Sequence, residues 1–227
     1  FPIHIFLIIP FIGLILSFLI PSKKEILIYR LAFYTAGITL IVFIGFIITW
    51  FIQGHPSINI AEVALYRTHG YEFVVDLYFD KISAVYLMVG GMLTFLITIY
   101  SRYYLHREKG YKRFFSTILL FYLGYNTTVL SGNFETLFIG WELLGISSFL
   151  LIAFYRERYL PVRNAVKVFT IYRIGDVGIL LAMWASHHLW HENITFAKLY
   201  NYDLVHEHLQ NHSLIGVIIS LGLLVAA

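Results

Sequence analysis

The sequence contains no cysteine and few charged residues. The absence of cysteine among 227 residues excludes disulfides, thiolate catalysis and iron-sulfur ligation by this stretch of chain. Charged residues make up 13%, about half of the usual quarter in a soluble domain. A net charge of only +3 argues against nucleic-acid binding. Hydrophobic residues reach 59% and the mean hydropathy is +0.76, so the composition indicates a protein embedded in a lipid bilayer.

Six apolar stretches are long enough to cross a membrane, because roughly 20 helical residues span ~30 Å of hydrocarbon. A seventh begins at Ser213 and reaches only about 22 Å by Ala227, so we expect it to be truncated. The first stretch has no basic segment before it and no small-residue cleavage site after it, so we interpret it as a span and not as a signal peptide. The six predicted spans are 3–20, 28–52, 82–101, 114–131, 134–155 and 164–186.

Basic residues gather on alternate connections between these spans. The connections after spans one, three and five carry eleven Lys and Arg residues, against three on the opposite side, Arg67, Lys81 and Lys198. Basic connections stay in the cytoplasm. The asymmetry predicts that the first residues face the exterior.

The connection at 53–81 has a different pattern. Residues 71–80 read YEFVVDLYFD and follow the turn-prone THG at 68–70. Aromatic and β-branched residues after a turn favour a short exterior β-hairpin. An amphipathic helix over 58–65 is the alternative. We find no internal repeat, no low-complexity segment and no sign of a second domain.

Two neighbouring predicted spans carry charged residues that are candidates for function. Glu142 is in span 134–155, and Lys167, Arg173 and Asp176 are in span 164–186. A charged side chain at the bilayer centre costs about 2.5 to 3.5 kcal/mol on insertion scales, so it normally faces the bundle interior and has a partner. These four residues are our candidates for proton translocation.

Glu142 and Asp176 are expected at one depth. Glu142 is eight residues from the outer end of its span, roughly 12 Å down, and Asp176 is twelve residues from the inner end of the next, roughly 18 Å up. Arg173 precedes Asp176 by three residues and shares its helix face. This set suits a proton relay, because a carboxylate holds or releases its proton according to whether a cation is near.

Each of these residues also has a purely structural interpretation. Arg173 and Asp176 can form an ion pair that only fixes helix packing, and the ammonium of Lys167 can extend to the membrane surface. Small residues around Glu142 suit either a wet path or close helix packing. They are Gly140, Gly145, Ser147 and Ser148.

The ten histidines predict no metal site. They lie at span ends or in loops. His187 and His191 are one helical turn apart, but no HExxH motif and no carboxylate at ligand spacing accompanies them. No phosphate-binding glycine loop, nucleophile elbow or dinucleotide fingerprint occurs. We expect no cofactor and no catalytic centre in this chain.

Three ordered motifs resemble one family. They are GWELLGISSFLL at 140–151, KVF at 167–169 and RIGD at 173–176. This combination resembles the antiporter-like, proton-conducting membrane subunits of respiratory complex I, in particular the subunit L group of NADH-quinone oxidoreductase, which is related to Mrp antiporter subunits. GYKRFF at 110–115 and DKIS at 80–83 extend the resemblance over roughly residues 70 to 185.

The resemblance implies that Glu142 is an essential proton-site carboxylate that pairs with a lysine on the seventh span, and that Arg173 and Asp176 are a neighbouring charged pair. The stretch from Ser213 contains no lysine, since the sequence stops before the place where the family carries it. We therefore expect residues 1–227 to form a single transmembrane domain, the N-terminal part of a longer subunit.

These observations predict an all-α polytopic helix bundle of about seven spans with a short exterior hairpin, in the inner membrane. By resemblance, it moves protons within a complex I-like assembly and has other membrane subunits as partners. The alternatives are an Mrp-type sodium/proton antiporter subunit, a structural membrane anchor, and a subunit of an inorganic carbon uptake complex with a soluble zinc-protein partner. The Trp-Glu pair at 141–142, which carbon-uptake relatives tend to lose, favours the respiratory or antiporter function.

Overall fold

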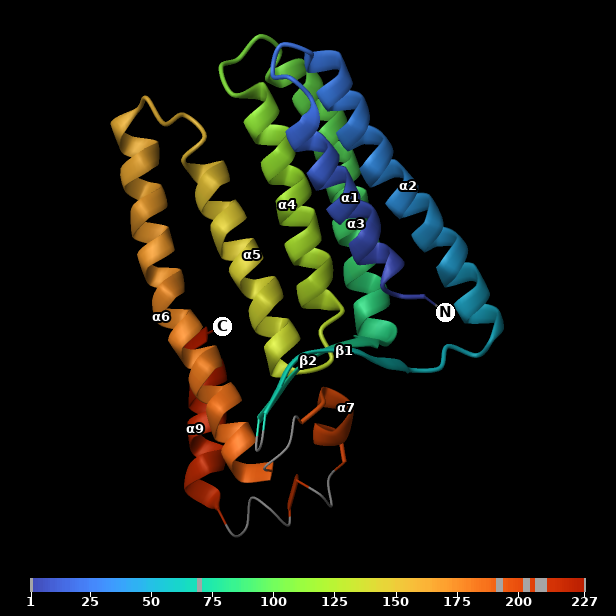
Figure 1. The fold of residues 1–227 in the computed structure, drawn as a ribbon, viewed down its shortest axis with the longest axis vertical. Coiled ribbons are helices and arrows are strands. Elements are labelled where there is room, and N and C mark those ends of the chain that lie inside the picture. The colour runs from blue at the N-terminus through green and yellow to red at the C-terminus, as the bar shows by residue number, and fades with distance from the viewer. Residues whose placement is uncertain (1, 69–70, 191–193, 202–204, 207–211, 227) are drawn as a thin grey trace.

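A computed structural model describes residues 2–68, 71–190, 194–201, 205–206 and 212–226. Helices dominate, and two strands form one small sheet (Figure 1). The elements are α1 (Ile5–Leu19), α2 (Glu25–Ile52), β1 (Ile58–Thr68), β2 (Tyr71–Phe79), α3 (Lys81–Tyr104), α4 (Tyr111–Val129), α5 (Phe134–Ile152), α6 (Tyr159–Trp190), α7 (Phe196–Leu199) and α9 (Ser213–Ala226).

The helices have the lengths and composition of a multi-pass membrane protein. In the described part of the chain, α2, α3, α5 and α6 are long and apolar enough to cross a bilayer, and α1 and α9 are shorter apolar helices. The helix α4 packs against α1, α3 and α5. Each predicted span contains a helix, although α6 extends beyond the predicted 164–186 at both ends. The helical membrane fold is confirmed.

The local sequence sets where several helices begin. Asp80 caps α3 by accepting a hydrogen bond from the Ser83 amide at 2.8 Å, and Asn133 caps α5 by accepting one from the Thr136 amide at 2.8 Å. Such caps satisfy amides that lack an intrahelical partner. The predicted spans therefore begin at defined residues and not at arbitrary points of an apolar run.

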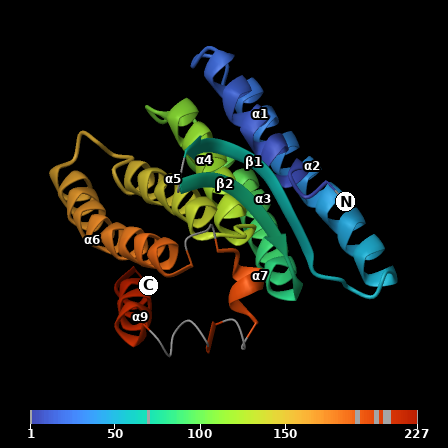
Figure 2. The same ribbon diagram turned by 60° about the horizontal axis from the view of Figure 1, so that its bottom comes forward.

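The predicted hairpin is present. The strands β1 and β2 are antiparallel, with Ile58 opposite Phe79 at the open end, so the alternative amphipathic helix over 58–65 was wrong. The expected turn residues 69–70 lie outside the described part of the chain. The hairpin lies across one end of the bundle (Figure 2). There Leu77 and Phe79 are buried in a core with Trp50 and Phe6.

The connections α1–α2, α3–α4 and α5–α6 lie together at the end opposite the hairpin (Figure 1). These are the connections that carry most of the basic residues. A second core lies in this half of the bundle, built from α1, α2 and α4; it includes Leu14, Ile28, Tyr29, Phe115 and Leu119.

The helix α6 packs between α5 and α9. The approach to α9 is close at a pair of glycines, because a Cβ on Gly222 would lie 2.6 Å from the Gly178 carbonyl oxygen. One turn away, a Cβ on Gly175 would lie 3.3 Å from the carbonyl oxygen of Ala226. The end of α9 therefore lies beside the turn of α6 that carries Asp176.

Candidate proton-translocation site

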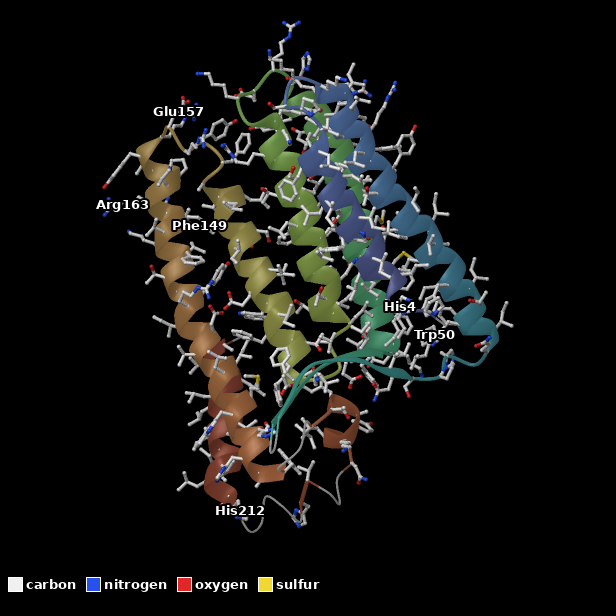
Figure 3. The ribbon with its side chains drawn as sticks, in the orientation of Figure 1. His4, Trp50, Phe149, Glu157, Arg163 and His212 are labelled. Carbon is white, nitrogen blue, oxygen red and sulfur yellow. The ribbon has the colours of Figure 1, made fainter. Side chains whose placement is uncertain are left out.

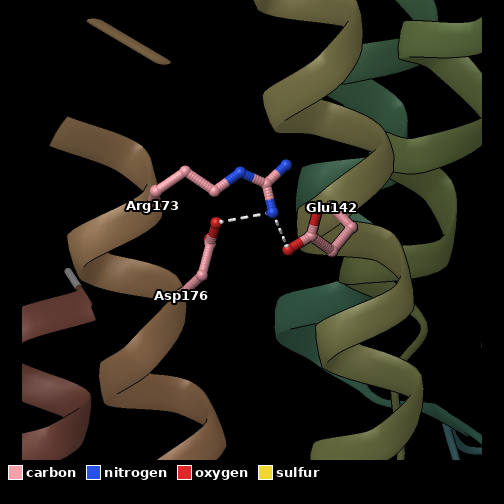
Figure 4. Close-up of polar contacts among 3 residues, drawn as sticks. All are labelled: Glu142, Arg173 and Asp176. Carbon is pink, nitrogen blue, oxygen red and sulfur yellow. Dashed lines mark hydrogen bonds and ion pairs between the residues drawn. The ribbon is translucent and has the colours of Figure 1, made fainter. Parts of the chain in front are cut away.

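A charged cluster joins α5 to α6 (Figure 4). The Arg173 Nη1 atom donates to Glu142 Oε1 at 2.6 Å and lies 3.2 Å from Asp176 Oδ2. One guanidinium nitrogen is therefore shared by two carboxyl groups from neighbouring helices. The structure brings together three of the four candidate residues, at the common depth expected from their positions along the two spans.

Packing of α5 against α4 directs Glu142 toward α6. A Cβ on Gly140 would lie 2.9 Å from the Thr128 Cα atom, so this face of α5 is pressed against α4. Successive residues turn by about 100° in an α-helix, and Glu142 thus projects about 200° away from Gly140. Gly140 is required for helix packing, and the same packing presents the carboxyl group to α6.

The cluster is graded in burial. The side chain of Asp176 is 9% exposed, that of Glu142 20% and that of Arg173 41%. The guanidinium of Arg173 also lies 4.6 Å from the centre of the Phe169 ring, a cation–π contact from the preceding turn. Trp141 interacts with Asp176 through its side chain. Arg173 therefore contacts both of its neighbouring turns, Phe169 in the preceding turn and Asp176 in the following one, while it bridges the two carboxyl groups.

Lys167 is not part of this cluster. Its side chain is exposed, and within the described residues it has no hydrogen bond or ion pair to Glu142, Arg173 or Asp176. Six residues separate it from Arg173, about 9 Å along the helix and on another face. Its place in a proton path remains a prediction from the sequence.

Comparison with known proteins identifies the family. The protein family described as "NADH:quinone oxidoreductase/Mrp antiporter, TM" matches residues 131–227. The family described as "NADH-Ubiquinone oxidoreductase (complex I), chain 5 N-terminus" matches residues 66–115. This chain belongs to the antiporter-like membrane subunit family of complex I and Mrp antiporters. The charged cluster lies in the first of these matched regions.

Curated relatives of this chain include a bacterial and a chloroplast protein. NADH-quinone oxidoreductase subunit L of Neisseria meningitidis serogroup A is 40% identical over 115 residues, which cover 50% of this chain and 17% of the relative. The chloroplastic NAD(P)H-quinone oxidoreductase subunit 5 of Chlorokybus atmophyticus is 30% identical over 183 residues, covering 78% and 28%. The chain thus spans less than a third of the length of these relatives.

A solved structure shares the fold. It is the membrane-bound sulfane sulfur reductase, an archaeal respiratory membrane complex, with a TM-score of 0.71 and 16% sequence identity; the match covers 99% of this chain and 42% of that one. At this identity the likeness establishes the arrangement of helices. The shared fold extends over 99% of this chain.

The small residues near the cluster have separate roles. Gly145 has open space where a Cβ would lie, and the Ser147 hydroxyl donates to the Leu143 carbonyl of its own helix at 2.7 Å. Ser148 lines a cavity of about 260 Å³ between α4, α5 and α6, together with Trp141 and Tyr172. Gly140 therefore serves close helix packing, whereas Gly145 and Ser148 border open space.

The sequence analysis did not identify two carboxyl groups that are buried in the structure. Asp76 on β2 is 1% exposed, and Glu135 in the first turn of α5 is 3% exposed. Both are near the hairpin end, where a sequence pattern predicts contact with water. Side chains alternate between the two faces of a strand, so the pattern at 76–79 places Asp76 on the face opposite Leu77 and Phe79 and carries no signal for its burial.

Burial raises the pKa of Asp76 from 3.8 to about 6. The nearby backbone amide of Leu77 offsets part of that increase. Within the described residues, neither carboxyl oxygen of Asp76 has a hydrogen-bond partner. The group is therefore poised to change charge near neutral pH.

No group of three or more His, Asp or Glu side chains in the described residues has the geometry to hold a metal ion. Of the histidine pair considered from the sequence, His187 lies in α6, and His191 lies outside the described part of the chain. The expectation that His187 and His191 bind no metal therefore stays a prediction from the sequence.

Proposed function

We propose that this chain is the N-terminal part of a proton-translocating membrane subunit in a respiratory complex I-like assembly, and that protons pass through Glu142. Arg173 and Asp176 control the charge of that carboxyl group. Other membrane subunits are its partners, and the inner membrane is its location. The proposal is supported by the shared guanidinium between two carboxyl groups on different helices.

Charge counting explains how the cluster handles a proton. With both carboxyl groups ionised, the cluster has one cation and two anions, a single excess negative charge. One added proton makes it neutral, which is the favoured state in a medium that solvates charge poorly. Two carboxyl groups that share one cation also titrate as a coupled unit.

Arg173 is the side chain of the cluster that can move. It is the most exposed member of the cluster, and both of its acceptors contact the same nitrogen. A shift of the guanidinium toward Asp176 leaves Glu142 without its cation, and Glu142 then takes up a proton. Return of the guanidinium stabilises the ionised Glu142 and releases the proton.

Replacing Glu142 by Gln tests the proposal in the full-length subunit within its own complex. The amide keeps the size of the side chain but cannot carry a proton, so we expect proton pumping in reconstituted vesicles to be lost while assembly is unchanged. Glu157→Gln is the matched control, because Glu157 is an exposed carboxylate on the α5–α6 connection. Retained pumping in Glu142→Gln would instead support the structural anchor.

An Mrp-type antiporter subunit is the second candidate, because the matching description names both groups. Sodium-dependent transport that still requires Glu142 would favour it over the respiratory function. Co-purification of a soluble zinc protein, with no redox subunits, would favour the carbon-uptake alternative. The transport assay and the purification together separate these three functions.

A further inference from the structure

A basic cavity opens at the end of the bundle opposite the hairpin. It has a volume of about 450 Å³ and lies between the α3–α4 and α5–α6 connections. Five basic and two acidic side chains line it, a net charge of +3. The basic residues are Arg107, Lys109, Arg113, Arg156 and Arg158.

The two acidic side chains do not neutralise the cavity. Glu157 lies 3.9 Å from Lys109, and both side chains are highly exposed, so this ion pair is weak. Arg156 and Arg113 are close enough to repel each other electrostatically. A bound anion would relieve this repulsion, and the cavity therefore has the charge of an anion site.

An apolar groove continues from this cavity toward the middle of the bundle. The groove has a volume of about 510 Å³, and Leu14, Leu120 and Leu150 from α1, α4 and α5 line it. Glu108, Gly110 and Arg113 belong to the lining of both the groove and the basic cavity. Between Gly110 and Leu120 the chain rises about 15 Å, which is half of a ~30 Å hydrocarbon core.

Arg113 is positioned at the junction of the two spaces. Its Nη2 atom donates to the Phe154 carbonyl at 2.7 Å, and its guanidinium lies 5.4 Å from the centre of the Phe154 ring. A guanidinium has five N–H donors, so Arg113 can hold this contact and also bind a phosphate. Gly110 leaves the space for it, because a Cβ there would lie 2.9 Å from Nη2.

We propose that the basic cavity and the apolar groove together bind one anionic phospholipid. Its phosphate lies among Arg113, Arg156 and Arg158, and one acyl chain lies along α4 between α1 and α5. The juxtaposition of a cationic cavity with an apolar groove one leaflet deep selects a lipid over a free anion. Basic pockets between membrane helices recognise anionic head groups in this way.

Native mass spectrometry of the full-length protein, delipidated and then given phosphatidylglycerol or phosphatidylcholine with identical acyl chains, tests the site. We expect phosphatidylglycerol to be retained at least about tenfold better, and the double variant Arg156→Gln/Arg158→Gln to lose about tenfold of that retention. The control Arg30→Gln/Arg163→Gln removes the same charge from the same end, outside the cavity and groove, and should retain lipid as the parent does.

Three outcomes would overturn the proposal. The first is equal retention of the two lipids by the parent protein, and the second is equal losses in the two double variants. The third is displacement of phosphatidylglycerol by soluble glycerol phosphate at comparable concentration, which would show that the groove contributes nothing and that the cavity is a site for a free anion. The first and third measurements need only the folded parent protein.

Discussion

The Nη1 atom of Arg173 lies 2.6 Å from Oε1 of Glu142, and this contact connects the middle of α5 to the middle of α6 (Figure 4). Figure 3 shows the side chains along the two helices, with Phe149 of α5 and Arg163 of α6 labelled. The same Nη1 atom lies 3.2 Å from Asp176 on its own helix. A change in the position of one guanidinium therefore changes the environment of two carboxyl groups at once.

Removal of this cation should affect both stability and transport. In Arg173→Gln, two carboxyl groups remain near each other without a cation, and we expect the free energy of unfolding to fall by about 1 to 2 kcal/mol, given the partial exposure of the pair. Proton pumping should be strongly reduced. Thermal unfolding in detergent and pumping in vesicles measure the two effects.

The double variant Arg173→Gln/Asp176→Asn separates them. It removes one of the two uncompensated carboxyl groups, so stability should recover while pumping does not. Arg163→Gln, which changes an exposed arginine on the same helix, should alter neither quantity. Normal pumping in Arg173→Gln would contradict the role given to the shared guanidinium.

From the buried position of Asp76 we predict that the attachment of the hairpin to the α4–α5 connection depends on pH. Because burial raises its pKa to about 6, the folded state binds more protons than the unfolded state between pH ~4 and 6, and stability falls as the pH rises through this window. Above it the ionised, buried carboxylate destabilises the folded state fully. Asp76→Asn should therefore stabilise the hairpin attachment at pH 8 and have little effect at pH 4.

Amide hydrogen exchange at Gly132 and Tyr78 measures this attachment. Their amides donate to the Asp76 and Leu130 carbonyls, each at 2.8 Å, and so join β2 to the α4–α5 connection. After correction for intrinsic exchange, protection should be greater in Asp76→Asn than in the parent at pH 8. Equal protection at that pH would mean that Asp76 stays neutral or finds a partner.

The contact between α6 and α9 depends on glycine. A Cβ on Gly178 would collide with the Gly222 carbonyl oxygen, and two backbones leave no flexible atom to move aside. Gly178→Ala should lower the free energy of unfolding by about 1 to 3 kcal/mol. Gly145→Ala is the matched helical control, since it meets nothing within 4 Å, and it should be neutral or stabilising by up to about 1 kcal/mol.

Cysteine labelling can test the proposed orientation, because the chain contains no cysteine of its own. Ser57→Cys places an exposed thiol at the start of the hairpin, and Glu157→Cys places one on the α5–α6 connection. With any further cysteines of the full-length protein replaced, an impermeant maleimide added to intact cells should label position 57 only. Labelling at 157 alone would reverse the orientation.

The sequence by itself determined where the helices lie and which residues are out of place in lipid. Apolar runs of about 20 residues satisfy their backbone groups in hydrocarbon by forming hydrogen-bonded helices. The cost of burying charge singles out four residues, which are Glu142, Lys167, Arg173 and Asp176. Helical spacing even placed the two carboxyl groups at one depth, because rise per residue is nearly constant.

Only the tertiary structure decided how these residues meet. Helix rotation is set by packing, as at Gly140 against Thr128, and a pattern along one helix does not contain it. The same reason explains why Asp76, in a strand that a sequence pattern assigns to the membrane surface, is buried beneath the α4–α5 connection. Burial depends on which elements from elsewhere in the chain cover a residue, and that is a property of the assembled fold.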